Sequence, residues 1–112
     1  MTAMNGDQIL AVYETISRLT RQMLAAARDS NWERLVALEK DCSAQIARLD
    51  GNGDGVTRDL DYQRRKASLI RRILDDDAEI RLLVEPWLAQ LSVLIGNTRQ
   101  QARLHRAYRA GQ

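Results

Sequence analysis

Apolar residues recur at intervals of three and four positions near the start of the chain. They are Ile9, Val12, Tyr13, Ile16, Leu19, Met23, Leu24 and Ala27. Because an α-helix turns once in about 3.6 residues, this spacing gathers the side chains on one face. The pattern predicts a helix over residues 7–28. Asp7 is expected to be its N-cap, since the carboxylate can accept from the free amides of the first turn.

A second apolar stripe starts directly after a short polar break at residues 29–31. It consists of Trp32, Leu35, Leu38, Cys42, Ile46 and Leu49. This stripe predicts a helix over residues 32–49 capped by Asn31, and the short connection predicts an antiparallel hairpin with the first helix. The run from Asp50 to Gly55 alternates Asp or Asn with Gly, which is typical of a flexible loop.

The third stripe is the longest and predicts one bent helix over residues 58–95. Its apolar positions are Leu60, Leu69, Ile70, Ile73, Leu74, Ile80, Leu83, Trp87, Leu91 and Leu94. Asp75, Asp76 and Asp77 do not interrupt it, because the face returns in phase about three turns after Leu69. Pro86 removes one backbone donor and predicts a bend near residues 82–86 rather than a stop.

Gly96 and Asn97 are the expected end of that helix, and the chain beyond them is poor in apolar residues. Residues 98–108 predict a short and mobile C-terminal helix. The predicted fold is therefore all-α. Two shorter helices pack on one long bent helix in an antiparallel bundle, and residues 1–112 form a single domain.

Composition and charge narrow the classes of protein further. Among 112 residues the formal net charge is only +2, which argues against bulk nucleic-acid binding. The exception is a basic tail that contains Arg99, Arg103, Arg106 and Arg109. The chain has one cysteine, no secretory signal pattern and no apolar run of the roughly 20 residues that cross a bilayer. We expect a cytoplasmic protein with no membrane association.

The loop between the second and third helices offers one candidate metal site. Asp50, Asn52, Asp54, Gly55 and Asp61 match the ligand spacing of an EF-hand calcium loop. However, the last ligand is Asp where Glu is usual, and Arg58 places a cation at the ninth position. An ordinary loop between helices uses the same residue types. A calcium-responsive regulator is therefore the alternative, and the expectation is no metal and no cofactor.

No set of residues predicts catalysis. Asp75, Asp76 and Asp77 point 100° apart on a helix and are expected to form a solvated face. Cys42 lies on an apolar stripe and is expected in the core, whereas His105 is expected at the surface. A small DNA-binding protein that uses the arginine tail is a further alternative. A second basic patch, Arg64, Arg65, Arg71 and Arg72, is diluted by nearby aspartates and lacks interleaved aromatic residues for base stacking, so we expect a solvent-facing helix with salt bridges there.

The third helix carries more apolar side chains than two shorter helices can cover. This surplus predicts a groove for an amphipathic helix of another protein, with Ile70, Ile73, Leu74, Ile80 and Leu83 as partner-binding residues. Self-association into a homodimer through the same face is the alternative.

Three segments together resemble the FliT family of flagellar export chaperones. They are Asn-Trp-Glu-Arg-Leu at 31–35, Leu-Ser-Val-Leu-Ile-Gly at 91–96, and Leu104 with Ala107 and Tyr108. The resemblance implies a cytoplasmic chaperone that holds the C-terminal segment of the filament-cap protein before type III export. It also implies binding to the export ATPase and to the flagellar master transcription activator, and hence regulation of flagellar genes.

The resemblance also implies a role for the C-terminal helix. Ile70 and Leu74 match apolar positions of the third helix of the family, and Tyr108 matches the tyrosine of its last helix. Leu104, Ala107 and Tyr108 are then expected to cover the partner-binding surface in the free protein, which makes that helix autoinhibitory. The loop at 50–61 and Pro86 match no motif of the family.

Overall fold

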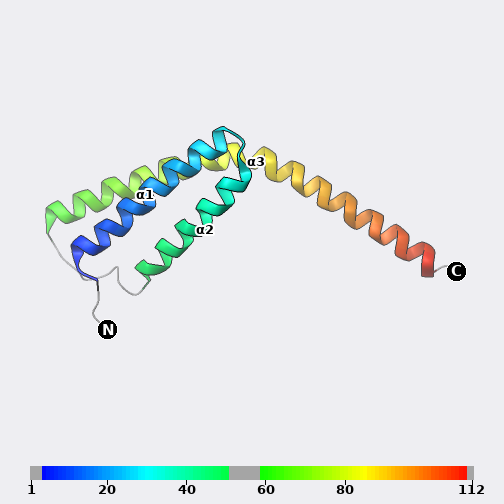
Figure 1. Ribbon diagram of the computed structural model, residues 1–112, viewed down its shortest axis with the longest axis horizontal. Coiled ribbons are helices and arrows are strands. Elements are labelled where there is room, and N and C mark those ends of the chain that lie inside the picture. The colour runs from blue at the N-terminus through cyan, green and yellow to red at the C-terminus, as the bar shows by residue number, and fades with distance from the viewer. Residues whose placement is uncertain (1–3, 51–58, 111–112) are drawn as a thin grey trace. The chain divides into compact units, whose positions relative to one another are not determined.

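The chain forms three helices in a computed structural model that describes residues 4–50 and 59–110, with side chains through residue 95. They are α1 (Gly6–Arg28), α2 (Trp32–Leu49) and α3 (Leu60–Ala110) (Figure 1). The described residues contain no strand, so the predicted all-α class is confirmed. None of the described helices holds an apolar stretch that could cross a membrane.

The first helix begins two residues earlier than Asp7 would place it, because Asn5 is the N-cap. The Asn5 side chain accepts from the Gln8 amide at 2.8 Å, and the Gln8 side chain accepts from the Asn5 amide at 2.9 Å. This reciprocal pair satisfies two donors at once. The prediction of Asp7 as the cap was therefore wrong. Asp7 lies in the first turn, where its charge favours the helix dipole.

A three-residue turn joins α1 to α2. The Asn31 amide donates to the Ala26 carbonyl at 2.8 Å and the Ser30 amide to the Ala27 carbonyl at 3.1 Å, which together form a Schellman motif. Ser30 takes the left-handed conformation that this motif requires, with φ of 55°. Asn31 then accepts from the Arg34 amide and caps α2, as predicted. The tight turn makes α1 and α2 antiparallel neighbours.

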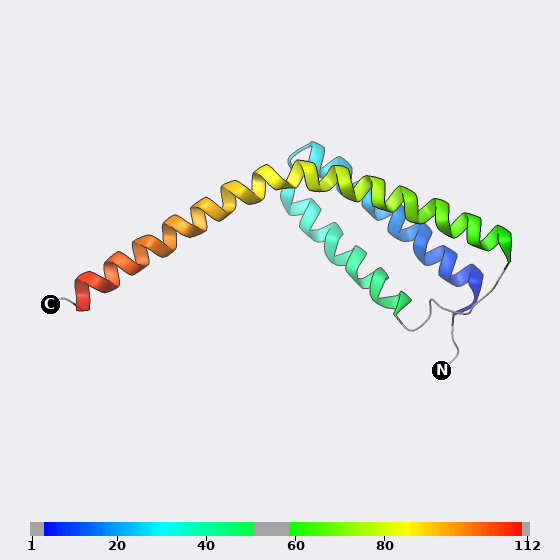
Figure 2. The same cartoon turned by 180° about the vertical axis from the view of Figure 1, so that it is seen from behind.

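The start of α3 lies beside α1, and the two helices run in the same direction (Figure 2). Glu14 pairs with Arg65 at 3.6 Å, and Arg28 pairs with Glu79 at 2.7 Å. Positions 14 and 28 on α1 and positions 65 and 79 on α3 are both fourteen residues apart, which fixes a parallel register. Arg65 of α3 thus forms a salt bridge to α1.

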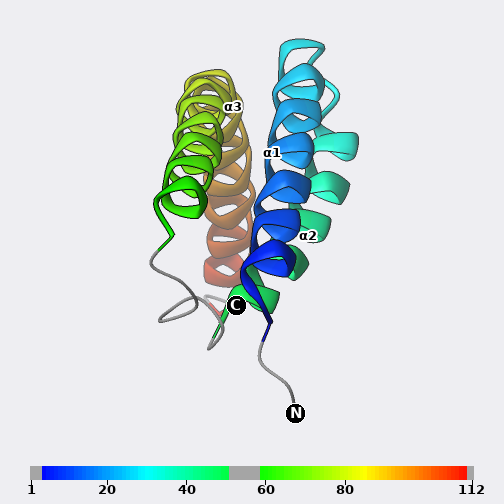
Figure 3. The ribbon, with the colours of Figure 1, turned by 90° about the vertical axis from the view of Figure 1, so that its left-hand side faces the viewer.

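Most of the core belongs to α1. Its buried residues are Ile9, Leu10, Val12, Ile16, Thr20, Met23, Leu24, Ala26 and Ala27. From α2 only Leu35, Leu38 and Cys42 are buried. In the view along the helices, the first half of α3 lies on one side of α1 and α2 lies on the other (Figure 3). This arrangement leaves much of α2 and α3 facing solvent.

The third helix is longer than predicted at its C-terminal end. It starts at Leu60 rather than at residue 58, and it continues through Gly96 and Asn97 to Ala110. Residues 98–108 are therefore the end of α3 and not a separate helix. Glycine weakens a helix by about 1 kcal/mol without stopping it, and the Arg, Gln, Ala and Leu residues that follow are good helix formers.

Pro86 lies inside α3, which confirms that it does not end the helix. Proline leaves the carbonyl of Leu82 without its helical donor. Leu82 is 70% exposed, so water can satisfy this carbonyl. The chain divides into two compact units at this point, Met1–Arg81 and Leu82–Gln112. Whether the helix bends there, and whether residues 1–112 act as one domain, stay predictions.

Candidate functional site

The five predicted partner-binding residues differ in how accessible they are. In the first unit, Ile70 and Ile73 are half-buried on α3, whereas Leu74 is 60% exposed. Ile80 is only 6% exposed, so in this state it belongs to the core and cannot touch a partner. Leu83, in the second unit, is 36% exposed. The set is therefore split between the two units, and its role in binding stays a prediction.

The richest apolar surface belongs to the second unit, where one face of α3 is lined by large side chains. We call this surface the 83–95 face, and it consists of Leu83, Val84, Trp87, Leu88, Leu91, Leu94 and Ile95. At 100° per residue these positions fall within a sector of about 140°. Leu82 and Val93 point to the opposite side by the same rule. A single helix cannot bury such a face by itself, which favours docking of another helix.

The second helix adds a smaller apolar surface that the sequence pattern did not separate from the core. Val36 is 46% exposed and Ile46 is 50% exposed. Ile46 was predicted in the buried stripe, and its exposure corrects that assignment. The core interacts with α2 mainly at its first half, because Leu35, Leu38 and Cys42 are its buried residues.

The aspartate triplet is not uniformly solvated, which corrects the prediction of a solvated face. Asp76 is 5% exposed, and its Oδ2 accepts from Thr20 Oγ1 at 3.4 Å and from Arg21 Nε at 3.2 Å. Asp75 is exposed, and Asp77 pairs with Arg81 one turn later at 2.9 Å. Asp76 therefore links α3 to α1 through these hydrogen bonds and is not a free metal ligand.

One sequence signal could have revealed the orientation of Asp76. Tyr62, Leu69 and Asp76 are spaced seven apart, and the structure places Tyr62 and Asp76 inside. Leu60 and Leu74, fourteen residues apart, share the opposite phase and are 61% and 60% exposed. The predicted stripe included Leu60 and Leu74 and left out Tyr62, so it was wrong at these positions.

Tyr62 completes the core at the start of α3. It packs with Ile9 and Leu10, and Met4, Tyr13, Leu49 and Leu69 surround the cluster. The Lys66 ammonium lies 5.8 Å from the Tyr13 ring centroid and 5.9 Å from the Tyr62 ring centroid, within the range of cation–π attraction. Burial, and then the neighbouring Tyr13, raises the pKa of Tyr62 above its ordinary value. This tyrosine therefore stays neutral at physiological pH.

Among the described side chains, those considered for chemistry show no catalytic arrangement. Cys42 is buried as predicted, and burial, with the carboxylates of Glu39 and Asp77, raises the pKa of its thiol. A thiol that resists ionisation is a poor nucleophile. Within residues 4–50 and 59–95, no three His, Cys, Asp or Glu side chains gather to hold a metal ion.

Several predicted residues fall outside the part of the chain that can be described. Asp50 and Asp61 are exposed, but residues 51–58 of the calcium-type loop lie outside the described residues. The side chains of Leu104, His105, Ala107 and Tyr108 also lie outside them, although their backbone belongs to α3. The calcium alternative and the autoinhibitory contact therefore stay untested.

Comparisons with known proteins agree with this helical architecture. Residues 10–110 match the family model described as "Flagellar protein FliT". Flagellar protein FliT of Photorhabdus laumondii is 30% identical over 104 residues, which cover 93% of this chain and 83% of that protein. Flagellar protein FliT of Yersinia pseudotuberculosis is 31% identical over 108 residues, with 91% and 85% covered.

A solved structure supports the same relationship. The crystal structure of flagellar protein FliT from Bordetella bronchiseptica superposes with a TM-score of 0.66 at 36% sequence identity. The match covers 77% of this chain and 98% of that chain. Sequence and fold thus agree over most of the molecule, and the chain belongs to the FliT family of flagellar proteins.

Proposed function

We propose that this protein is a cytoplasmic flagellar export chaperone that holds the C-terminal segment of the filament-cap protein before type III export. The observation that carries this proposal is the 83–95 face, an apolar surface on a helical segment in which none of the described side chains, 82–95, is buried. Membership of the FliT family supports a flagellar role. A chaperone of this kind needs apolar surface for a guest and needs no active site.

The guest that suits the 83–95 face is an amphipathic helix. Leu88, Leu91 and Leu94 are 51%, 38% and 63% exposed, so each has side-chain area left to bury. Full burial of a leucine side chain contributes about 1.5–3 kcal/mol, before the losses from ordering the guest.

Leu83 provides the sharpest test, because Leu82 is its neighbour on the other side of the helix. We expect Leu83→Asp to weaken binding of the filament-cap C-terminal segment roughly tenfold or more, since a carboxylate would be desolvated at the interface. Isothermal titration calorimetry with the full chain measures the affinity.

Leu82→Asp is the matched control for this experiment. It places the same charge one residue away, at a side chain that is 70% exposed and points away from the 83–95 face. We expect its affinity to stay within about threefold of the original. Equal affinities for both variants, whether weakened or unchanged, would show that the 83–95 face is not the docking surface.

We propose further that the end of α3 regulates access to the apolar surface. In this mechanism Leu104, Ala107 and Tyr108 cover Ile70 and Leu74 in the free protein, and the guest displaces them. Because residues 98–110 continue α3, covering positions on the same helix requires the chain to reverse direction. Gly96 and Asn97 are suited to such a reversal, since both tolerate positive φ.

Removing the chain after Thr98 tests this mechanism. If the covered form makes up nine tenths of the free protein, the truncated chain should bind the filament-cap segment about tenfold more tightly. Calorimetry on both chains gives the comparison, and circular dichroism confirms that the truncated chain keeps its helices. An unchanged affinity would exclude autoinhibition and leave the proposed docking surface intact.

The resemblance to the family suggests two further partners. We propose that the protein also binds the export ATPase and the flagellar master transcription activator, and that through the activator it regulates flagellar gene expression.

A homodimer formed through the 83–95 face is the alternative occupant of that surface, and it would compete with the filament-cap segment. Sedimentation of the Leu83→Asp and Leu82→Asp variants distinguishes the two, because only the first should then lose a dimer.

A further inference from the structure

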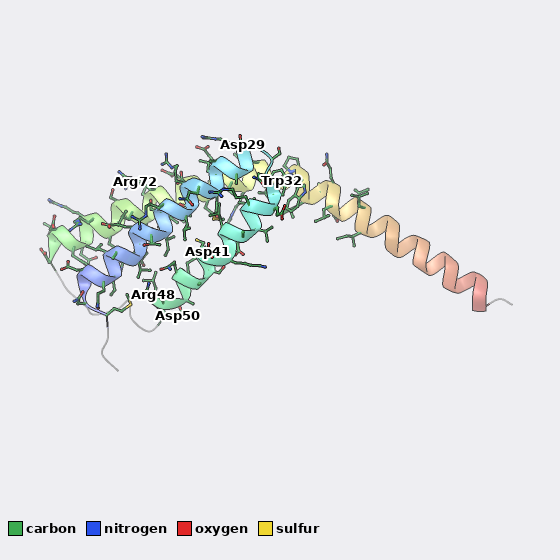
Figure 4. All side chains as sticks on the ribbon, in the orientation of Figure 1. Asp29, Trp32, Asp41, Arg48, Asp50 and Arg72 are labelled. Carbon is green, nitrogen blue, oxygen red and sulfur yellow. The ribbon has the colours of Figure 1, made fainter. Side chains whose placement is uncertain are left out.

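A groove between α1 and the first half of α3 is lined mainly by charged side chains, unlike the apolar surfaces described above. It encloses about 300 Å³ and is lined by Glu14, Arg64, Arg65, Ser68, Leu69 and Arg72. Arg72 is labelled on α3 beside α1 in Figure 4. All six residues belong to the first unit, so the groove does not depend on the second.

Positive charge in this groove exceeds what its one carboxylate can balance. Glu14 pairs with Arg65 at 3.6 Å. Arg64 and Arg72 are exposed, and neither forms an ion pair within the described part of the chain. Three arginines and one glutamate leave a formal charge of +2 in a small volume.

The rest of the boundary between α1 and α3 has no such excess of positive charge, and its N-terminal end is lined by Asp7, Asp59 and Asp61 beside Arg65. Further along the two helices, Arg21 pairs with Asp76 and Arg28 pairs with Glu79. The floor of the groove is apolar, because Leu69 is half-buried against the cluster of Ile9, Leu10 and Tyr62. Two unpaired guanidinium groups therefore lie beside a partly accessible leucine.

We propose that this groove is a docking site for an acidic segment of a partner protein. Arg64 and Arg72 are eight residues apart, which places their backbones about 12 Å apart along the helix. In an extended peptide, carboxylates four residues apart span about 13 Å, so each can meet one guanidinium. An apolar side chain between them packs on Leu69. The site goes beyond the proposed function, since it uses another surface and another chemistry.

Charge reversal at the two unpaired arginines tests the site. The probe is a short peptide in which pairs of glutamates alternate with single leucines, titrated into the full ¹⁵N-labelled chain. We expect shifts of the amide and guanidinium signals at residues 64–72. Each substitution turns the attraction between an arginine and a glutamate of the peptide into a repulsion. Arg64→Glu combined with Arg72→Glu should therefore weaken binding of the peptide roughly tenfold. Added salt should weaken binding of the peptide to the unaltered chain.

Arg34→Glu combined with Lys40→Glu is the matched control, since both residues are exposed on α2, which does not line the groove, and the change in net charge is the same. Its affinity should change by less than about threefold at moderate salt. The proposal is overturned if the control loses as much affinity, or if the shifts lie elsewhere. It is also overturned if inorganic phosphate produces the same shifts with equal affinity, because the groove would then be a site for small anions.

Discussion

Replacing Ile9 with alanine lowers the free energy of unfolding by about 2–5 kcal/mol, which is the usual range for Ile→Ala in a packed core. Ile9 is 0% exposed and packs with Leu10 and Tyr62 at the junction of α1 and α3. Alanine removes buried apolar area and leaves a cavity that two helices in fixed register cannot easily close. Urea denaturation followed by circular dichroism measures the change.

Ile46→Ala is the matched control, because it makes the same chemical change at a side chain that is 50% exposed. We expect a loss below about 1 kcal/mol there, since little buried area is removed. Equal losses at the two positions would contradict the assignment of Ile9 to the core. Ile46 can be altered without disturbing the core because its side chain faces solvent.

The first two helices could be predicted because their signals are local. The apolar spacing of α1 and α2 is regular, and Asn31 caps α2 through a bond to an amide only three residues away. The error at the start of α1 came from choosing between two local caps. Asn5 prevails over Asp7 because Gln8 returns a second hydrogen bond, which Asp7 has no partner to match.

The third helix was harder to predict because two apolar phases overlap in it. Leu60 and Leu74 suggest one face, and Tyr62 with Ile80 occupies another. The sequence spacing offers both faces, and the position of α1 decides between them through contacts that join residues more than fifty positions apart. A polar residue such as Asp76 can then lie in the core, provided that partners on α1 satisfy it.

The apolar face and the basic groove also differ in how far the sequence alone predicts them. The sequence predicted an apolar surplus on the third helix but assigned docking to residues 70–83, and the structure shows that the helix continues without a break through the 83–95 face. The basic groove could not be found from the sequence, because Arg64 and Arg65 are equivalent until Glu14 is seen to pair with only one of them. Ile80 was predicted to be a docking residue but is buried. Its burial depends on neighbouring helices, which the spacing of apolar residues in the sequence does not specify.

Asp76 gives the second large effect on stability. We expect Asp76→Ala to lower the free energy of unfolding by about 1–3 kcal/mol, the range for losing hydrogen bonds to a buried charged group. The change removes the acceptor of Thr20 Oγ1 and of Arg21 Nε. Thr20 keeps its bond to the Ser17 carbonyl at 3.0 Å, and Arg21 can turn to solvent because its side chain is 68% exposed. The loss therefore combines the two missing hydrogen bonds with the emptied space between α1 and α3.

Asp75→Ala is the control, since Asp75 is exposed one residue earlier on the same helix. Alanine is the better helix former by up to about 0.7 kcal/mol, so this variant should be unchanged or slightly more stable. Alanine gives the same gain in helix propensity at position 76, where it partly offsets the loss of stability. The difference in free energy of unfolding between the two variants therefore isolates the contacts of Asp76 with α1. Urea denaturation of both chains gives that difference. If the two variants were equally stable, the contacts of Asp76 with Thr20 and Arg21 would contribute nothing to joining α3 to α1.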